Sequence, residues 1–203
     1  QNGLGAHLAA LEAFSELPIY AAVTTEGVNA PDSQTVVHAG TGNTLIGPLN
    51  ETAKQKLTKV RQLADIASPG LSVSIDNAIW RRLWLKLAIN CAINPFTAIL
   101  NCNNGSVKDS ALFISTWPGL REELAAMLVT SGYPITEFEL EEKVFKVMYD
   151  TQHNISSMLQ DIRKNKPTEI DDINGFAASY LSDQHIPYEV NKALVEQVNA
   201  LRN

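Results

Sequence analysis

The segment from Ile79 to Leu100 constrains the fold more than any other part of the sequence. Its apolar side chains recur around almost the whole circumference of an α-helix, which is typical of a buried helix. Three polar residues, Lys86, Asn90 and Asn94, follow one another at four-residue intervals and therefore line one face. Buried polar groups are costly unless they have partners or line a cavity. The sequence predicts a buried helix whose polar face needs partners.

Two interpretations of this polar face stay open from the spacing alone. In the first, Lys86 extends its ammonium group to solvent, and the two amides cap neighbouring helices. In the second, the face borders a cleft. Pro95 favours the second interpretation, because it follows Asn94 directly and removes one helical hydrogen bond, and we expect it to kink or break the helix there.

The chain before residue 50 has the character of a small α/β unit. Four apolar residues at helical spacing (Leu4, Leu8, Leu11 and Phe14) precede an apolar and β-branched run at Ile19–Thr25, which predicts a helix followed by a buried strand. Residues 35–40 and 43–47 are expected to be two further strands. The turn residues between them predict an antiparallel hairpin.

From residue 51 onwards the pattern is helical. We expect helices over 51–67, from Asp76 to Leu100, and over 107–132, 137–164, 168–182 and 189–202, with a short strand or connector at 71–75. The predicted domains are 1–72, which contains the strands, and 73–203, which is helical.

Composition excludes several classes of function. The 203 residues carry a formal charge of -6, so no basic field for nucleic acid exists. No apolar run approaches the ~18–20 residues of a membrane span, and the cytoplasm is the expected compartment. The four histidines do not cluster at metal-ligand spacing, and neither Cys91 nor Cys102 has an evident base partner, so we expect no metal site and no cysteine nucleophile.

Further polar residues are ordinary when taken singly. Asn104 lies in an Asn-Asn-Gly turn, and Asn154 and Ser157 are expected to share one helical face with Asp161. Thr168 has the position of an N-cap, and Glu169 would then stand in the first turn, where the helix dipole favours it.

Together, these motifs resemble the ketopantoate reductase (2-dehydropantoate 2-reductase) family of NADPH-dependent enzymes of pantothenate biosynthesis. Each motif is weak alone, but their order and spacing cover essentially the whole chain. The motifs are, in chain order, Gln1–Gly5, Val23–Gly27, Lys86–Pro95, Asn104–Gly105, Asn154–Asp161, Thr168–Gly175 and Ile186–Asn191.

The resemblance implies an α/β remnant of a Rossmann domain (helix, strand, β-hairpin) followed by an all-α C-terminal domain of the 6-phosphogluconate-dehydrogenase-like type. The active site would lie in the cleft between them. Lys86 matches the catalytic general acid, since hydride arriving at a carbonyl leaves charge on oxygen that an ammonium group stabilises and protonates. The matching substrate-binding residues are Lys86, Asn90, Asn94, Asn104, Asn154 and Ser157, and the matching NADPH-binding residues are Asn2, Val28 and Glu169.

The family's Gly-rich turn and first strands have no counterpart in this sequence, which contains no Gly-x-Gly-x-x-Gly fingerprint. We therefore expect this chain to be the C-terminal part of such an enzyme, to bind NADPH poorly and to be inactive by itself. Two rival hypotheses remain: a reductase of another 2-oxo acid on the same fold, and a non-catalytic helical interaction or dimerisation module. A small-molecule substrate is the expected partner, with no nucleic acid and no membrane, and a homodimer is left open.

Overall fold

The computed structural model describes residues 2–29, 32, 34–40, 42–58, 60, 62 and 72–201. These residues form two compact units. The strand unit is Ala6–Leu83, and the helical unit combines Gln1–Gly5 with Trp84–Asn203. The domain boundary near residue 72 stays a prediction.

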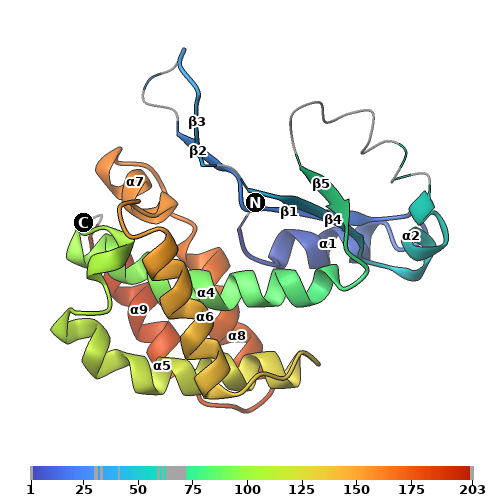
Figure 1. Cartoon of the computed structure of the whole chain (residues 1–203). Helices are drawn as coiled ribbons and strands as arrows, with labels where there is room; N and C mark the ends of the chain where they lie inside the picture. Colours follow the sequence, from blue (N-terminus) through green and yellow to red (C-terminus); the bar gives the residue numbers. More distant parts are fainter. Residues whose placement is uncertain are drawn as a thin grey trace. The chain divides into compact units, whose positions relative to one another are not determined.

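A mixed three-stranded sheet is the centre of the strand unit (Figure 1). Its order is β1 (Tyr20–Thr24), β4 (Thr44–Pro48) and β5 (Val73–Ile75). β1 and β4 are antiparallel, with Ala22 opposite Ile46, whereas β4 and β5 are parallel. The strands predicted around 19–25 and 71–75 are thus confirmed as β1 and β5.

A separate two-stranded ribbon pairs β2 (Gly27–Asn29) with β3 (Val37–Gly40). The predicted hairpin between 35–40 and 43–47 is therefore wrong in its pairing. The reason lies at the end of β1, where the Thr25 amide donates to the Asn43 carbonyl (3.1 Å) and the Asn43 amide donates to Thr25 Oγ1 (3.0 Å). These bonds continue the β1–β4 ladder and leave β3 to pair with β2.

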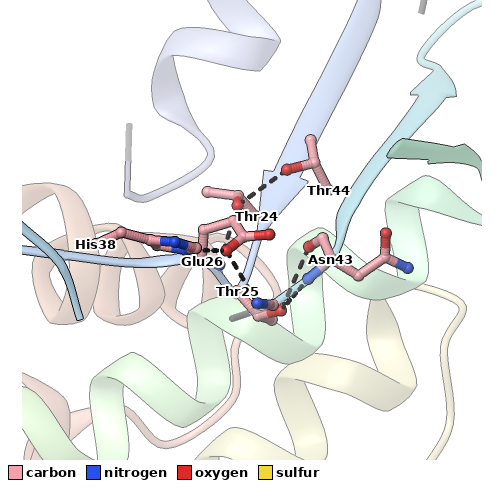
Figure 2. A network of polar contacts seen from close by, with 7 residues as sticks. Thr24, Thr25, Glu26, His38, Asn43 and Thr44 are labelled. Carbon is pink, nitrogen blue, oxygen red and sulfur yellow. Dashed lines mark hydrogen bonds and ion pairs between the residues drawn. The ribbon is translucent and has the colours of Figure 1, made fainter. Parts of the chain in front are cut away.

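The Glu26 carboxylate joins the ribbon to this ladder (Figure 2). Its Oε2 accepts a hydrogen bond from the Gly42 amide (2.9 Å) and lies 2.6 Å from His38 Nε2. A Cβ at Gly42 would lie 2.4 Å from the Thr25 carbonyl carbon, so only glycine fits beside this junction.

The strand unit has a small core. Its buried apolar residues, among those described, are Ala21, Val23, Leu49, Ala53, Ile79 and Leu83. The helix predicted before the first strand is confirmed as α1 (Gly5–Ala13), which buries none of its residues; Leu8 is 41% exposed, and Phe14, just after the helix, is 57% exposed. Helix α2 (Glu51–Gln55) begins after Asn50, whose side chain accepts from the Ala53 amide; much of the helix predicted over 51–67 lies outside the described residues.

The helical unit packs its helices around one core (Figure 1). Its elements are α4 (Ile79–Leu100, which begins in the strand unit), η1 (Asn104–Ser106), α5 (Ala111–Thr130), α6 (Glu137–Asp150), α7 (Ser157–Arg163), η2 (Asp171–Gly175), α8 (Phe176–Asp183) and α9 (Glu189–Ala200). Segment η2 is π-helical and leads directly into α8. The aromatic rings of Phe96 and Phe113 meet edge to face at 5.0 Å, and Phe113 stacks on Trp117 at 5.2 Å.

Two helical predictions need correction. The helix expected over 137–164 is two helices, because Ser156 caps a new helix by accepting from the Leu159 amide. The helix expected to begin at Thr168 has no cap there: Thr168 Oγ1 is buried without a hydrogen-bond partner among the described residues, and η2 has no side-chain cap.

The buried helix predicted from the apolar pattern is confirmed as α4. Of the two outcomes expected at Pro95, a break is wrong, since α4 continues to Leu100, and a kink stays a prediction. The expectation that no segment approaches a membrane span is also wrong by length and composition, since α4 among the described residues qualifies. This is weak support for a membrane span, because most of α4 is buried inside the protein and a core helix passes the same test.

Candidate functional site

The polar face of α4 meets two segments that are distant in sequence. Asn90 Nδ2 donates to Asn2 Oδ1 (3.2 Å), and Asn2 Nδ2 donates to Glu169 Oε2 (2.8 Å). Asn2 lies just before α1 and Glu169 just before η2, and all three residues belong to the helical unit. The structure thus joins three of the predicted site residues into one hydrogen-bonded row.

Lys86 lies one helical turn before Asn90 and is half-buried. Burial lowers the pKa of Lys86 below its ordinary value, while the nearby Glu169 carboxylate raises this pKa. A lysine held in this way is not the solvent-extended lysine of our first interpretation. It can donate a proton more readily than a free lysine, and its carboxylate neighbour favours the protonated form.

The loop that carries Asn2 is anchored on the helical unit by its neighbours. Gly3 has a φ of +82°, and a Cβ at this position would lie 2.4 Å from the Asp172 carbonyl oxygen. Leu4 is only 1% exposed. Because glycine alone tolerates both the backbone angle and the close approach to η2, Gly3 fixes where Asn2 can point.

A second group forms where η1 packs against the chain between α6 and α7. The backbone N–H of Asn104 donates to the backbone carbonyl of Asn154 (2.9 Å), and the side-chain Nδ2 of Asn104 donates to Thr151 Oγ1 (2.8 Å). The Asn104 Oδ1 atom is buried and has no hydrogen-bond partner among the described residues. The structure therefore brings Asn104 and Asn154 together and leaves an acceptor available.

The predicted helical face of Asn154, Ser157 and Asp161 is wrong for Asn154, which precedes α7. Ser157 is the first residue of α7 and its side chain is exposed. The buried serine is Ser156, whose Oγ lies 2.6 Å from Thr97 Oγ1. The sequence analysis missed this contact, although a serine three residues before a buried leucine is a recognisable cap.

Asn94 and Val28 complete the predicted set. Asn94 is 8% exposed, and its carbonyl accepts a hydrogen bond from Thr97 Oγ1 (2.8 Å). Val28 lies in β2 of the strand unit, opposite His38 of β3, and is 63% exposed. The hydrogen-bonded rows described above do not include Val28.

Comparison with known proteins decides the family. The family model described as "Ketopantoate reductase PanE/ApbA C terminal" matches residues 78–202, more than half of the chain. A 2-dehydropantoate 2-reductase of Vibrio cholerae is 34% identical over 201 residues, which are 98% of this chain and 66% of that protein. The chain belongs to the ketopantoate reductase family.

Two further relatives give the same result. The 2-dehydropantoate 2-reductase of Escherichia coli O157:H7 is 39% identical over 176 residues, covering 86% of this chain and 56% of that protein. The crystal structure of a PanE/ApbA family ketopantoate reductase from Ralstonia eutropha JMP134 has a TM-score of 0.82 at 25% identity, over all of this chain and 65% of that one. This chain therefore spans less than two thirds of these relatives.

The fold is shared more widely than the sequence. A ternary structure of D-mandelate dehydrogenase with NADH and anilino(oxo)acetate has a TM-score of 0.86 at 22% identity, over 99% of this chain and 65% of that one. At this identity the likeness shows the fold alone. The family resemblance and the fold class predicted from the motifs, a strand-containing part followed by a helical domain, are both confirmed.

The two cysteine thiols are held in the protonated form. Burial raises the pKa of both the Cys91 and the Cys102 thiols, so neither is a thiolate at neutral pH. In the part of the chain that the structure describes, no group of three or more His, Cys, Asp or Glu residues could hold a metal ion.

Proposed function

We propose that this chain carries the catalytic and substrate-binding residues of an NADPH-dependent 2-dehydropantoate 2-reductase, with Lys86 as the general acid. The observation that carries the proposal is the half-buried Lys86 beside Glu169, on the same helical face as Asn90. The names of the relatives supply the substrate class.

The chemistry follows from the charge that the reaction develops. NADPH, when bound, supplies the hydride for the carbonyl carbon of ketopantoate. Lys86 Nζ stabilises the negative charge on the carbonyl oxygen and donates the proton that converts it to the hydroxyl of pantoate. Glu169 keeps Lys86 protonated until that step, because its negative charge opposes the effect of burial.

The amide side chains suit the rest of the substrate, which has a carboxylate and a hydroxyl. We assign Asn90, Asn94, Asn104, Asn154 and Ser157 to its binding, together with Lys86. Amide N–H groups donate to a carboxylate, and the unpaired Oδ1 of Asn104 is an acceptor for a hydroxyl.

The cofactor is assigned to Asn2, Val28 and Glu169. Asn2 and Glu169 fit this role because each keeps bonding capacity: the bond between them uses one N–H of Asn2 Nδ2 and only the Oε2 atom of Glu169. The sequence holds no Gly-x-Gly-x-x-Gly turn for the pyrophosphate. We therefore propose that the chain by itself binds NADPH poorly and reduces no ketopantoate.

A chimera tests this proposal. The part of the Vibrio cholerae relative that this chain does not cover would be joined ahead of residue 1, and consumption of reduced nicotinamide would be followed with NADPH and with NADH. Lys86→Ala should lower kcat by about 10²–10⁴. Lys143→Ala, an exposed lysine of α6, is the control and should leave kcat unchanged. Equal activity of Lys86→Ala and the parent would support a non-catalytic interaction module instead.

The same chimera decides the substrate. Ketopantoate would be compared with the 2-oxo acid that corresponds to D-mandelate, because a D-mandelate dehydrogenase shares the fold. The proposal expects a higher kcat/KM for ketopantoate. A preference for the aromatic acid would assign the chain to another reductase of the family, and sedimentation of the same sample would show whether it is a homodimer.

A further inference from the structure

Pro95 leaves one backbone carbonyl of α4 without its helical hydrogen bond, and a side chain from another part of the helical unit supplies the missing donor. Proline has no N–H, so the Cys91 carbonyl, four residues earlier, loses its helical donor. Cys91 is fully buried, so bulk solvent does not reach it to replace that donor. Instead, Asn174 Nδ2 donates to the Cys91 carbonyl (3.2 Å) from segment η2.

Asn174 is one member of a longer buried row. Its Nδ2 also donates to Asn191 Oδ1 (2.9 Å), and Asn191 Nδ2 donates to Glu123 Oε2 (2.7 Å). Glu123 additionally accepts from the Val190 amide (2.8 Å) and the Asn191 amide (2.9 Å). The three side chains come from η2, α9 and α5, and each is at most 5% exposed.

The row has a fixed direction. The Glu123 carboxylate, which accepts these three bonds, must face the donor nitrogen of Asn191, so Asn191 turns its oxygen to Asn174. Asn174 must then present its nitrogen both to Asn191 and to the Cys91 carbonyl. Its own oxygen is left buried without a hydrogen-bond partner among the described residues. The opposite orientation of the Asn174 amide would place its oxygen against two acceptors and lose both bonds, so the observed direction is kept although one acceptor is left without a partner.

The contact between Asn174 and the Cys91 carbonyl lies close in sequence to two of the proposed site residues, Asn90 and Glu169. Cys91 follows Asn90 on α4, and Asn174 lies in the segment whose Ile173 amide donates to the Glu169 carbonyl (3.0 Å). The row therefore connects the backbone of the helix that carries Lys86 with the segment that follows Glu169.

We propose that Glu123, Asn191 and Asn174 form a positioning network that fixes α4 against η2 and thereby sets the separation of Lys86 and Glu169. The inference rests on the proposed function of Lys86, but its geometry belongs to the helical unit alone. The described hydrogen bonds of these three side chains do not include Lys86, so we infer that they act through the backbone of α4 or η2.

The test is a titration of Lys86 in the 203-residue chain, followed by NMR of isotope-labelled lysine, with the signal assigned from Lys86→Arg. Glu169→Gln should lower the pKa of Lys86, because it removes the opposing charge. Asn174→Ala should lower this pKa by a measurable part of the same shift, because η2 no longer holds Glu169 in place. An unchanged pKa in a folded Asn174→Ala protein would overturn the proposal.

Three further variants separate positioning from simple stability. Glu123→Gln keeps the size of the side chain, but its amide can donate as well as accept, so it no longer fixes the orientation of Asn191 and Asn174. This variant should also lower the pKa of Lys86, and it serves as the test if Asn174→Ala does not fold. Leu140→Ala removes a fully buried side chain of α6 outside the network, and should lower Tm without moving the pKa. Movement of the pKa in Leu140→Ala would mean that any loss of packing has this effect, and would overturn the proposal.

Pro95→Ala in the Asn174→Ala background is the sharpest control. It restores an N–H for the Cys91 carbonyl and should recover part of the Tm, but not the pKa of Lys86. Recovery of both would mean that the network only replaces the hydrogen bond lost at Pro95, and would overturn the inference.

The titration needs neither substrate nor cofactor, so it separates the two proposals. If the pKa shifts occur but the chimera does not reduce ketopantoate, the proposed function is rejected and the positioning role is kept. In an active chimera, Asn174→Ala should lower kcat and shift its pH profile.

Discussion

The helical unit and the strand unit stabilise their polar groups in different ways. In the helical unit, Glu123, Asn174 and Asn191 are buried and donate or accept in a fixed direction, within a core to which every long helix contributes. In the strand unit, the polar network joins the half-exposed His38 to Glu26, whose side chain is 9% exposed, and only six of the described residues are buried and apolar.

This difference indicates which unit can hold polar side chains in fixed positions. Buried hydrogen bonds in a packed core tolerate little displacement, whereas surface bonds exchange with water at little cost. The residues proposed for proton transfer, Lys86 and Glu169, are in the unit with the packed core. Asn2 precedes the strand unit in sequence but is bonded into the helical unit.

The largest expected effect comes from equal truncations in the two cores. Leu124→Ala, in the helical unit, should cost about 2–5 kcal/mol of unfolding free energy, because the fully buried site cannot collapse. Leu49→Ala, in the strand unit, should cost roughly 2 kcal/mol or less, because its side chain is 7% exposed and few of the described residues of that unit are buried and apolar. Urea unfolding measures both; equal losses would remove the contrast between the cores.

Glycine replacements should give the next largest effect. Gly3→Ala combines a positive φ with a clash against the Asp172 carbonyl and should cost roughly 2–4 kcal/mol. Gly132→Ala has a similar φ of +86° but open space around it, and should cost only about 1–2 kcal/mol. If thermal unfolding gave the same Tm for both variants, the close packing of the Asn2 loop on η2 would be refuted.

Lys86→Met should raise Tm slightly at neutral pH, because burial opposes the charge of Lys86. Its folded pKa lies below the unfolded value of about 10.4, so charging Lys86 destabilises the fold below the folded pKa. This penalty fades as the pH rises through the folded pKa towards the unfolded one. The Tm difference between Lys86→Met and the parent should therefore close at high pH; a difference independent of pH would have another cause.

The smallest effect is expected in the strand unit. The His38 hydrogen bond and the Gly42 amide lower the pKa of Glu26 below its ordinary value. The resulting stability is present above the ordinary glutamate pKa of about 4.3 and is lost as the pH falls through the folded pKa. Glu26→Gln should lower Tm only slightly at pH 7 and not at all in acid. A large loss at pH 7 would show that this exposed network stabilises the unit more than its surface position implies.

Prediction from the sequence was most successful for α4, where the pattern of apolar and polar residues follows the period of a single helix. The apolar pattern of 79–100 and the four-residue spacing of Lys86, Asn90 and Asn94 depend only on local geometry, and the structure has both. The partners of that face could not be derived in this way, since Asn2 and Glu169 are distant in sequence. Family resemblance named both residues, but not the bonds between them.

Pairing and exact helix starts were least predictable. Strand β4 could have paired with β3 or with β1, and the choice depends on bonds between Thr25 and Asn43 that no turn signal reveals. An error of one residue in the predicted start of α7 is enough to assign the site to the exposed Ser157 instead of the buried Ser156. The row from Glu123 to Cys91 has no local signal at all, because asparagine is common in loops and caps.

The π-helical hydrogen bonding of η2 has a consequence for the length of the chain. A π-turn holds one residue more than an α-turn, so this segment accommodates an extra residue without turning the helix that follows it. In a continuous α-helix, one extra residue would rotate everything after it by about 100° around the helix axis. The buried side chains of α8, Ala177, Ala178 and Leu181, would then point away from the core. The π-turn therefore lets Asn174 and the buried face of α8 both lie inside the helical unit.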